Sequence, residues 1–205
     1  MNRRPSSGIR RVERREANPI GATLDPSIVE RARRGDLQAF ESIVRDRMGA
    51  VYRLTLAIVG NEADAADATQ DAFVAAWRQI RSLRDATKLE AWLARIATNA
   101  ARMVVRGRRR RAVREIPGLD VTGLSAGGSP APSGWSPGER DARALATALD
   151  RLDPDRRAIL ALHHLEGRGI PEIATILGIR EGTAKSRLFA ARKALQAALE
   201  AEAGR

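Results

Sequence analysis

Apolar residues recur at intervals of three and four positions along most of this 205-residue chain, the spacing of helices with one buried face. In the N-terminal half, the spacing predicts a short helix that Asp25 or Ser27 caps, a long helix ending at 60–61, a third over 62–80 and a fourth from about 88. No segment shows the strict alternation of a half-buried strand. The predicted fold class is therefore all-α.

A second group of helices is predicted from residue 139 to the C-terminus, with a break at Asp153-Pro154. The apolar stripes expected to face inward on both sides of this break are Leu145, Ala148, Leu149 and Leu152, then Ile159, Leu160, Leu162 and Leu165. Residues 113–138 are rich in Pro, Gly and Ser and lack periodicity, which predicts a flexible linker. Residues 1–24 are Arg-rich with few apolar residues and are predicted to be disordered.

The chain is therefore expected to form two small helical bundles, one over 25–112 and one over 139–205. Their division by a segment that cannot bury a core predicts two separate modules.

The stretch 168–195 has the pattern of a helix-turn-helix. Pro171 suits the first turn of a helix, and Gly178 can adopt the left-handed conformation that ends it. The outward residues of the second helix have the chemistry of phosphate and base contacts in a DNA major groove: Thr183, Lys185, Ser186, Arg187 and Arg192. An ordinary amphipathic helix pair within a bundle fits the same spacing, so spacing alone leaves both interpretations open.

Charge favours the DNA interpretation. The chain has 36 Lys and Arg against 25 Asp and Glu, a formal net charge of +11, which favours a polyanionic partner such as nucleic acid. An anionic membrane surface is the alternative, but the longest apolar run, 54–59, is too short to span a bilayer, and we expect no membrane insertion. The Arg-rich N-terminus lacks a following apolar signal-peptide core, so the expected location is the cytoplasm. The absence of Cys excludes disulfides and Cys-based metal sites.

An enzyme is a further alternative, because Asp64, Asp67 and Asp71 have a spacing that could hold Mg²⁺ on one helix face. The chain has no second acidic motif to complete such a site and no Gly-Lys phosphate loop. His163 and His164 are adjacent, so a helix would point them in different directions. We therefore expect no enzyme, no metal and no cofactor.

Four segments resemble the extracytoplasmic-function (ECF) group of bacterial sigma-70 family sigma factors. They are Asp-Ala-Ala-Asp-Ala-Thr-Gln-Asp-Ala-Phe-Val-Ala-Ala-Trp at 64–77, Trp-Leu-Ala-Arg-Ile-Ala-Thr-Asn at 92–99 with the following arginines, 165–174 and 181–188. Their order and spacing agree over about 27–112 and 139–198. The resemblance implies that the first module is sigma region 2 and the second is sigma region 4, in a protein that directs core RNA polymerase to promoters.

The resemblance also implies three sets of site residues. Those implied to dock on the clamp coiled coil of the polymerase β′ subunit are Asp64, Asp67, Gln70 and Asp71. The loop 81–87 and the following helix are implied to open the minus-ten element of promoter DNA, with contacts from Arg84, Asn99, Arg102 and Arg106. The outward residues of the helix-turn-helix are implied to bind the minus-thirty-five element. The β subunit and a cognate anti-sigma factor are further implied partners.

Three positions depart from the family pattern: Leu89 replaces an aromatic residue and is expected in the core, Arg180 replaces a small capping residue, and Ala184 replaces Val.

Two promoter elements some 16 base pairs apart lie roughly 55 Å from each other. The 112–138 segment can span at most roughly 90 Å, which is enough for the two modules to reach both elements.

A helix-turn-helix regulator that acts without polymerase is the alternative function, and it leaves the acidic side of the third helix unexplained.

Overall fold

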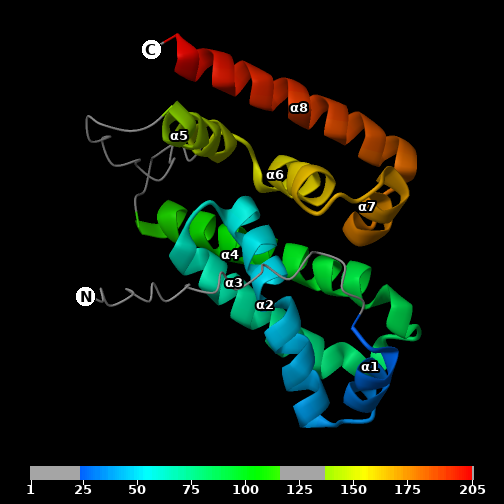
Figure 1. Cartoon of the computed structure of the whole chain (residues 1–205). Coiled ribbons are helices and arrows are strands. Elements are labelled where there is room, and N and C mark those ends of the chain that lie inside the picture. Colours follow the sequence, from blue (N-terminus) through cyan, green and yellow to red (C-terminus); the bar gives the residue numbers. More distant parts are fainter. Residues whose placement is uncertain (1–23, 116–136, 205) are drawn as a thin grey trace, which may run out of the picture.

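The computed structural model describes residues 24–115 and 137–204, and within these ranges all regular structure is helical (Figure 1). The all-α prediction is confirmed. Residues 1–23, within the segment expected to be disordered, lie outside the described residues, as do 116–136 of the expected linker. No described helix is both long and apolar enough to cross a membrane.

The helices begin and end close to the predicted positions. The first module contains α1 (Pro26–Arg33), α2 (Leu37–Val59), α3 (Glu62–Gln79), two 3₁₀ turns, η1 (Ile80–Ser82) and η2 (Ala86–Lys88), and α4 (Leu89–Glu115). The second contains α5 (Pro137–Asp150), α6 (Pro154–Leu160), a π-helical turn η4 (Ala161–Leu165), α7 (Ile170–Leu177) and α8 (Glu181–Ala203). Helices α4 and α5 each extend slightly into the predicted linker.

Short-range capping sets these boundaries. Asp25, Asn61 and Asp153 each accept a hydrogen bond from a backbone amide two or three residues later, at 2.9 Å, so each begins a helix. Gly60 and Gly178 end α2 and α7 with φ of +85° and +66°, the left-handed region that favours glycine. These caps involve near neighbours in the chain, which is why the sequence predicted the boundaries well.

The core of the first module lies where α2, α3 and α4 pack against one another. Ile43, Ile58 and Val105 are fully buried there, and Leu89 is buried as predicted. The hydroxyl groups of Thr55 and Thr69 form a buried hydrogen bond of 2.8 Å that joins α2 to α3. This core holds the outward sides of α3 and α4 in fixed positions.

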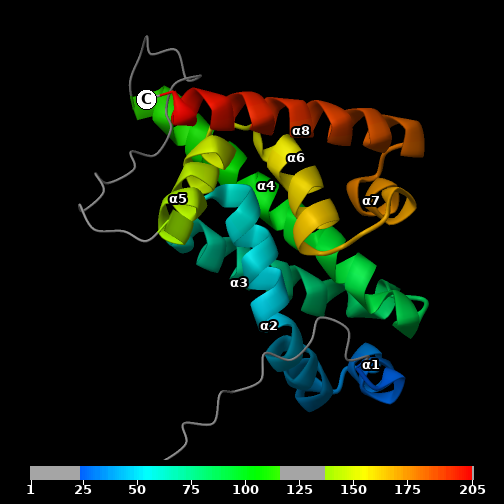
Figure 2. The same ribbon diagram turned by 45° about the horizontal axis from the view of Figure 1, so that its top comes forward.

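The two modules pack against each other. In Figure 1, α5, α6 and α7 lie between α8 and the first module. Helix α6 and turn η4 contact α2, and α7 contacts α4, so the buried apolar residues of both modules form one continuous cluster. Figure 2 shows α6 beside α4 from a second direction. The sequence pattern did not predict this contact.

Two of the predicted inward positions are wrong. Leu145 on α5 is 43% exposed, and Leu165 at the end of η4 is also exposed. Helix α5 packs mainly against α8, so only part of its apolar stripe is covered. A periodic stripe shows which side of a helix is apolar, but its neighbours decide how much of that side is buried.

Gly178 provides a test of the turn in the helix-turn-helix. A Cβ added at Gly178 would meet nothing within 4 Å, so Gly178→Ala introduces only the strain of a positive φ. We expect this change to lower the free energy of unfolding by about 1–2 kcal/mol, measured by urea denaturation. Gly182→Ala is the control, because Gly182 also has open space and lacks a positive φ, and it should not destabilise the protein.

Candidate functional site

The outward side of α8 carries the residues predicted to bind duplex DNA. Ala184, Leu188 and Ala191 are buried, so the opposite side of the helix faces solvent. The predicted residues Lys185, Ser186, Arg187 and Arg192 are exposed, and Thr183 is half-buried. The structure therefore brings these five residues onto one helix, with most of them free to meet a ligand.

The N-terminus of α8 lacks a side-chain cap, as the departure at Arg180 predicted. The N-terminus of α7, by contrast, is capped by Glu172, whose carboxylate accepts a hydrogen bond of 3.3 Å from the backbone N–H of Gly169. The uncapped amides at the start of α8 and the cation of Arg180 both suit a phosphate group at this helix end.

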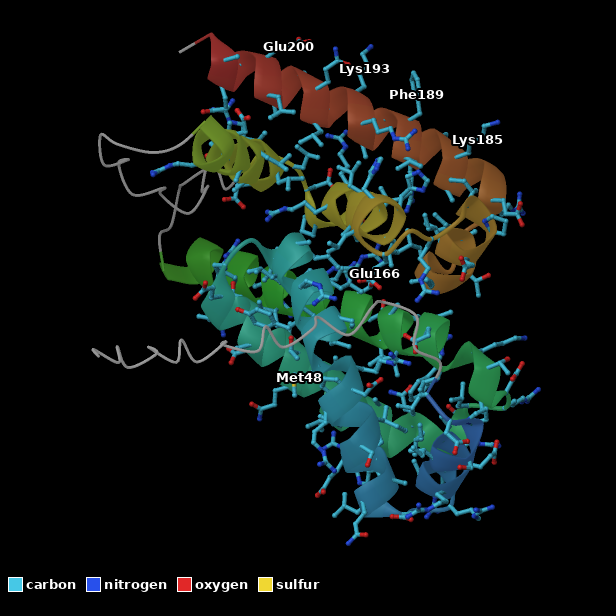
Figure 3. The ribbon with its side chains drawn as sticks, viewed as in Figure 1. Met48, Glu166, Lys185, Phe189, Lys193 and Glu200 are labelled. Atoms are coloured by element: carbon cyan, nitrogen blue, oxygen red, sulfur yellow. The ribbon has the colours of Figure 1, made fainter. Side chains whose placement is uncertain are left out.

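Phe189 was missed by the sequence analysis. Its side chain is 72% exposed, and Figure 3 shows it on the outward side of α8 between Lys185 and Lys193. The sequence could have indicated this position, because Phe189 lies four residues after Lys185 and four before Lys193. This spacing places its apolar ring between the two cations on one side of the helix. A ring at this place can make apolar contact with a thymine methyl group or a sugar.

Arg192 is held by a histidine of η4. Its Nε donates to His164 Nε2 over 3.3 Å. Burial, the neighbouring His163 and the Arg192 cation together lower the pKa of His164, so the neutral ring can accept this hydrogen bond. The sequence predicted two ordinary helix residues here, whereas in the structure His164 orients Arg192, a predicted DNA contact.

The predicted acidic surface lies on α3. Asp67, Gln70 and Asp71 are exposed, but Asp64 is different: its carboxylate accepts from Arg108 at 3.0 Å and from the Asn61 amide group at 2.9 Å. Asp64 therefore joins the start of α3 to α4. In the described ranges, no three His, Asp or Glu side chains come together in a way that could hold a metal ion.

An apolar groove adjoins this acidic surface, and the sequence analysis missed it. Its walls come from α2 and α3: Leu37, Phe40, Val44, Met48, Tyr52, Ala66, Thr69, Gln70, Phe73, Val74 and Trp77. Gln70 also lines the shallow cleft that contains Asp67 and Asp71, so groove and acidic surface are continuous. Leu37, Met48 and Val74 are exposed large apolar residues, and Figure 3 shows Met48 at the edge of α2.

The predicted minus-ten residues do not share one environment. Arg84, between η1 and η2, is exposed, as are Asn99 and Arg106 on α4. Arg102 has a side chain only 13% exposed, and its Nε lies 2.7 Å from Oδ1 of Asp155 on α6. Burial lowers the pKa of the Arg102 guanidinium, and Asp155 opposes that shift. Arg102 therefore faces the second module and not open solvent.

Family models match both modules. "Sigma-70 region 2" matches residues 43–111, and "Sigma-70, region 4" matches 142–195. The chain is 33% identical over 187 residues to the RNA polymerase sigma-H factor of Pseudomonas aeruginosa, covering 86% of this chain and 94% of that protein. It is 30% identical over 177 residues to the ECF RNA polymerase sigma-E factor of Escherichia coli, covering 83% and 92%.

Two solved structures resemble the fold. The sigma factor RpoE in complex with the anti-sigma factor NepR from Bartonella quintana matches with a TM-score of 0.62 and 28% identity, covering 78% of this chain and 96% of that one. CnrH in complex with the cytosolic domain of CnrY matches with a TM-score of 0.59 and 27% identity, covering 86% and 97%. The order of both regions, the all-helical fold and these relatives agree, and the chain belongs to the ECF group of the sigma-70 family of RNA polymerase sigma factors.

Proposed function

We propose that this protein binds core RNA polymerase in the cytoplasm and directs it to promoters, as a binding protein that catalyses no reaction itself. The observation that supports this most strongly is the separation of charge in a chain of net charge +11: carboxylates gather on α3, whereas arginines and lysines gather on α4 and α8. The acidic surface suits a basic protein partner, and the basic surfaces suit DNA.

The acidic surface and the apolar groove together form the proposed polymerase-binding surface. An amphipathic helical partner can place apolar side chains in the groove and basic side chains against Asp67 and Asp71. Asp64 has a second role, because its bond to Arg108 holds α3 against α4. The β′ clamp coiled coil and the β subunit are the proposed sites on polymerase.

Two DNA contacts are proposed. Exposed Arg84, Asn99 and Arg106, with Arg102 once it is released, would bind the minus-ten element, where opening the duplex costs a few kcal/mol per unstacked base that phosphate contacts can offset. The outward side of α8 would bind the minus-thirty-five element as duplex DNA. Arg187 is the proposed guanine contact, and Phe189 would add an apolar contact beside it.

A helix-turn-helix regulator acting without polymerase is the less favoured alternative, since it gives no role to the groove or to Asp67 and Asp71. Both solved structures reported above are complexes with protein partners, one of which is named as an anti-sigma factor. We propose that an anti-sigma factor controls this protein too.

Run-off transcription with purified core polymerase tests the proposed function. We expect specific transcripts from a subset of genomic fragments only when this protein is added. No specific initiation on any fragment, together with no binding to core polymerase, would contradict the proposal.

Charge reversal tests the polymerase-binding surface. Asp67→Lys with Asp71→Lys should weaken core binding at least about tenfold in fluorescence anisotropy, because like charges would then meet across the interface. The matched control is Asp141→Lys with Glu200→Lys, two exposed residues of the second module, which should leave core affinity nearly unchanged. Equal core affinity for both double variants would mean that the docking residues are assigned wrongly.

Two α8 variants separate base recognition from phosphate attraction. Arg187→Ala should reduce discrimination between the preferred site and a site with one guanine replaced, by about 1–3 kcal/mol in competition binding. Lys193→Ala should weaken binding to both sites equally and reduce the salt dependence of binding. If the two variants behave alike, Arg187 does not contact a base.

A further inference from the structure

His164 and Arg192 meet on the surface of the second module, where η4 lies beside α8. They are 28 residues apart in the chain, and both side chains are exposed. The Nε of Arg192 lies 3.3 Å from Nε2 of His164. A guanidinium group only donates hydrogen bonds, so His164 is the acceptor and its Nε2 carries no proton. The bond therefore exists only while the imidazole is neutral, with its proton on Nδ1.

The turn that carries His164 is held in place by its own hydrogen bonds. Turn η4 is π-helical, and the backbone N–H of Glu166 donates over 3.0 Å to the carbonyl oxygen of Ala161, five residues earlier. Such turns are rare and often occur at functional sites. Nδ1 of His163 donates over 3.1 Å to the carbonyl oxygen of Arg168, and the two histidine rings meet edge to face with centroids 4.7 Å apart. His164 therefore keeps its place whether or not it bonds a partner on α8.

Arg192 is placed to contact the DNA backbone and not base edges. In a helix-turn-helix, the first residues of the recognition helix contact the bases. Arg192 lies roughly 16 Å along α8 from Glu181, at 1.5 Å per residue, whereas the major groove is about 12 Å wide. When the start of α8 lies in the groove, Arg192 therefore falls beyond its edge, where the phosphates lie. Figure 3 shows its neighbour Lys193 on the outward side of the helix, in line with Lys185.

The bond to His164 prepares Arg192 for a phosphate. A free arginine side chain on a surface samples many rotamers, and binding a phosphate costs the entropy of fixing one of them. The bond at Nε fixes the side chain before DNA arrives. It uses only the Nε–H, so both terminal nitrogens keep their N–H groups for a bidentate contact with a phosphate.

Protonation of His164 breaks this arrangement. Burial, His163 and Arg192 together lower the pKa of His164, so the ring is neutral at pH 7 and takes up a proton only in acid. The proton occupies Nε2, which can then no longer accept from Arg192. It also places a cation beside the guanidinium, so an attraction becomes a repulsion.

The other helices packed against η4 are α2, α6 and α7. The charged side chains that they bring towards the turn have partners other than His164. Arg53 of α2 acts on Glu166, Glu172 of α7 pairs with Arg168, and the pairs made by α6 are Asp155 with Arg102, Arg156 with Asp153 and Arg157 with Asp150. Among the described residues, His163 and Arg192 are the charged or titratable groups that shift the pKa of His164.

We propose that His164 is a positioning residue for promoter binding: its neutral ring holds Arg192 ready for a phosphate beside the minus-thirty-five element, and a proton on the ring releases Arg192. This inference rests on the proposed function, because it gives a proton-sensitive role to the partner of a proposed DNA contact. The contribution of Arg192 to DNA binding is then complete at neutral pH and falls in acid.

A double-mutant cycle tests the positioning. The probe is a fluorescent 20-base-pair duplex of mixed sequence, because phosphate contacts carry no sequence information. At pH 7.5 we expect His164→Leu to weaken binding by the full-length protein about fivefold in anisotropy, a loss of the size of one hydrogen bond. In an Arg192→Ala background the same change should have no effect, because no side chain remains to be positioned. His164→Gln should keep most of the affinity, since its amide oxygen can accept.

The pH profile tests the role of the proton. His163 and His164 are the only histidines in the chain. The ratio of the Kd of Arg192→Ala to the Kd of the unaltered protein should fall between pH 7.5 and pH 5, whereas the same ratio in a His164→Gln background should stay constant. His163→Gln is the matched control: it removes a ring but leaves His164, so the ratio should still fall, at a higher pH, because His163 lowers the pKa of His164. Circular dichroism checks that each variant keeps its helices.

Three results would overturn the proposal. They are no effect of His164→Leu, an equal effect with and without the Arg192 side chain, and an Arg192 contribution that does not change with pH in the unaltered protein. The second would mean that the ring meets DNA itself.

The outcome is separable from that of the proposed function. Run-off transcription by the unaltered protein with core polymerase depends on the proposed function alone. Initiation without coupling between His164 and Arg192 would reject only the positioning role. Coupling between them in a protein that never initiates with core polymerase would reject only the sigma-factor role.

Discussion

The proposed polymerase-binding residues of α3 and the proposed DNA-binding residues of α8 lie on the solvent-facing side of a helix whose other side is buried. Ala184, Leu188 and Ala191 hold α8 in the second module, and this packing turns its cations outward. The same constraint on α3 exposes Asp67 and Asp71, while four alanines pack inward: Ala65, Ala68, Ala72 and Ala76. Because one core fixes both sides of each helix, the positions of the charges depend on the burial of the apolar stripes.

The abundance of arginine creates a second constraint, because like charges must be separated or paired. Asp64 pairs with Arg108 within the first module, and Asp155 pairs with Arg102 between the modules. Arg157 is almost fully buried and bonded to Asp150 and to the Leu152 carbonyl oxygen. These carboxylates pair arginines that would otherwise repel one another.

The sequence could predict the all-helical class, most helix boundaries and the residues on the outward sides of α3 and α8. These features depend on contacts between residues within about four positions of each other in the chain. Gly178 ends α7 and Arg180 leaves α8 uncapped, as the pattern indicated. The inward positions of Leu145 and Leu165 were predicted wrongly, since the extent of a stripe's burial depends on which helix covers it. The groove beside Gln70 was missed for the same reason: its two walls come from different helices.

The sequence by itself therefore determined the all-helical class, the two-module order and the chemistry of each exposed helix side, because periodicity and capping are local. Only the tertiary structure decided that the modules touch, that Arg102 meets Asp155 and not solvent, and that His164 holds Arg192. The members of these pairs lie 28 or more residues apart in the chain. No local pattern connects them, and only the packing of α6 and α8 brings them together.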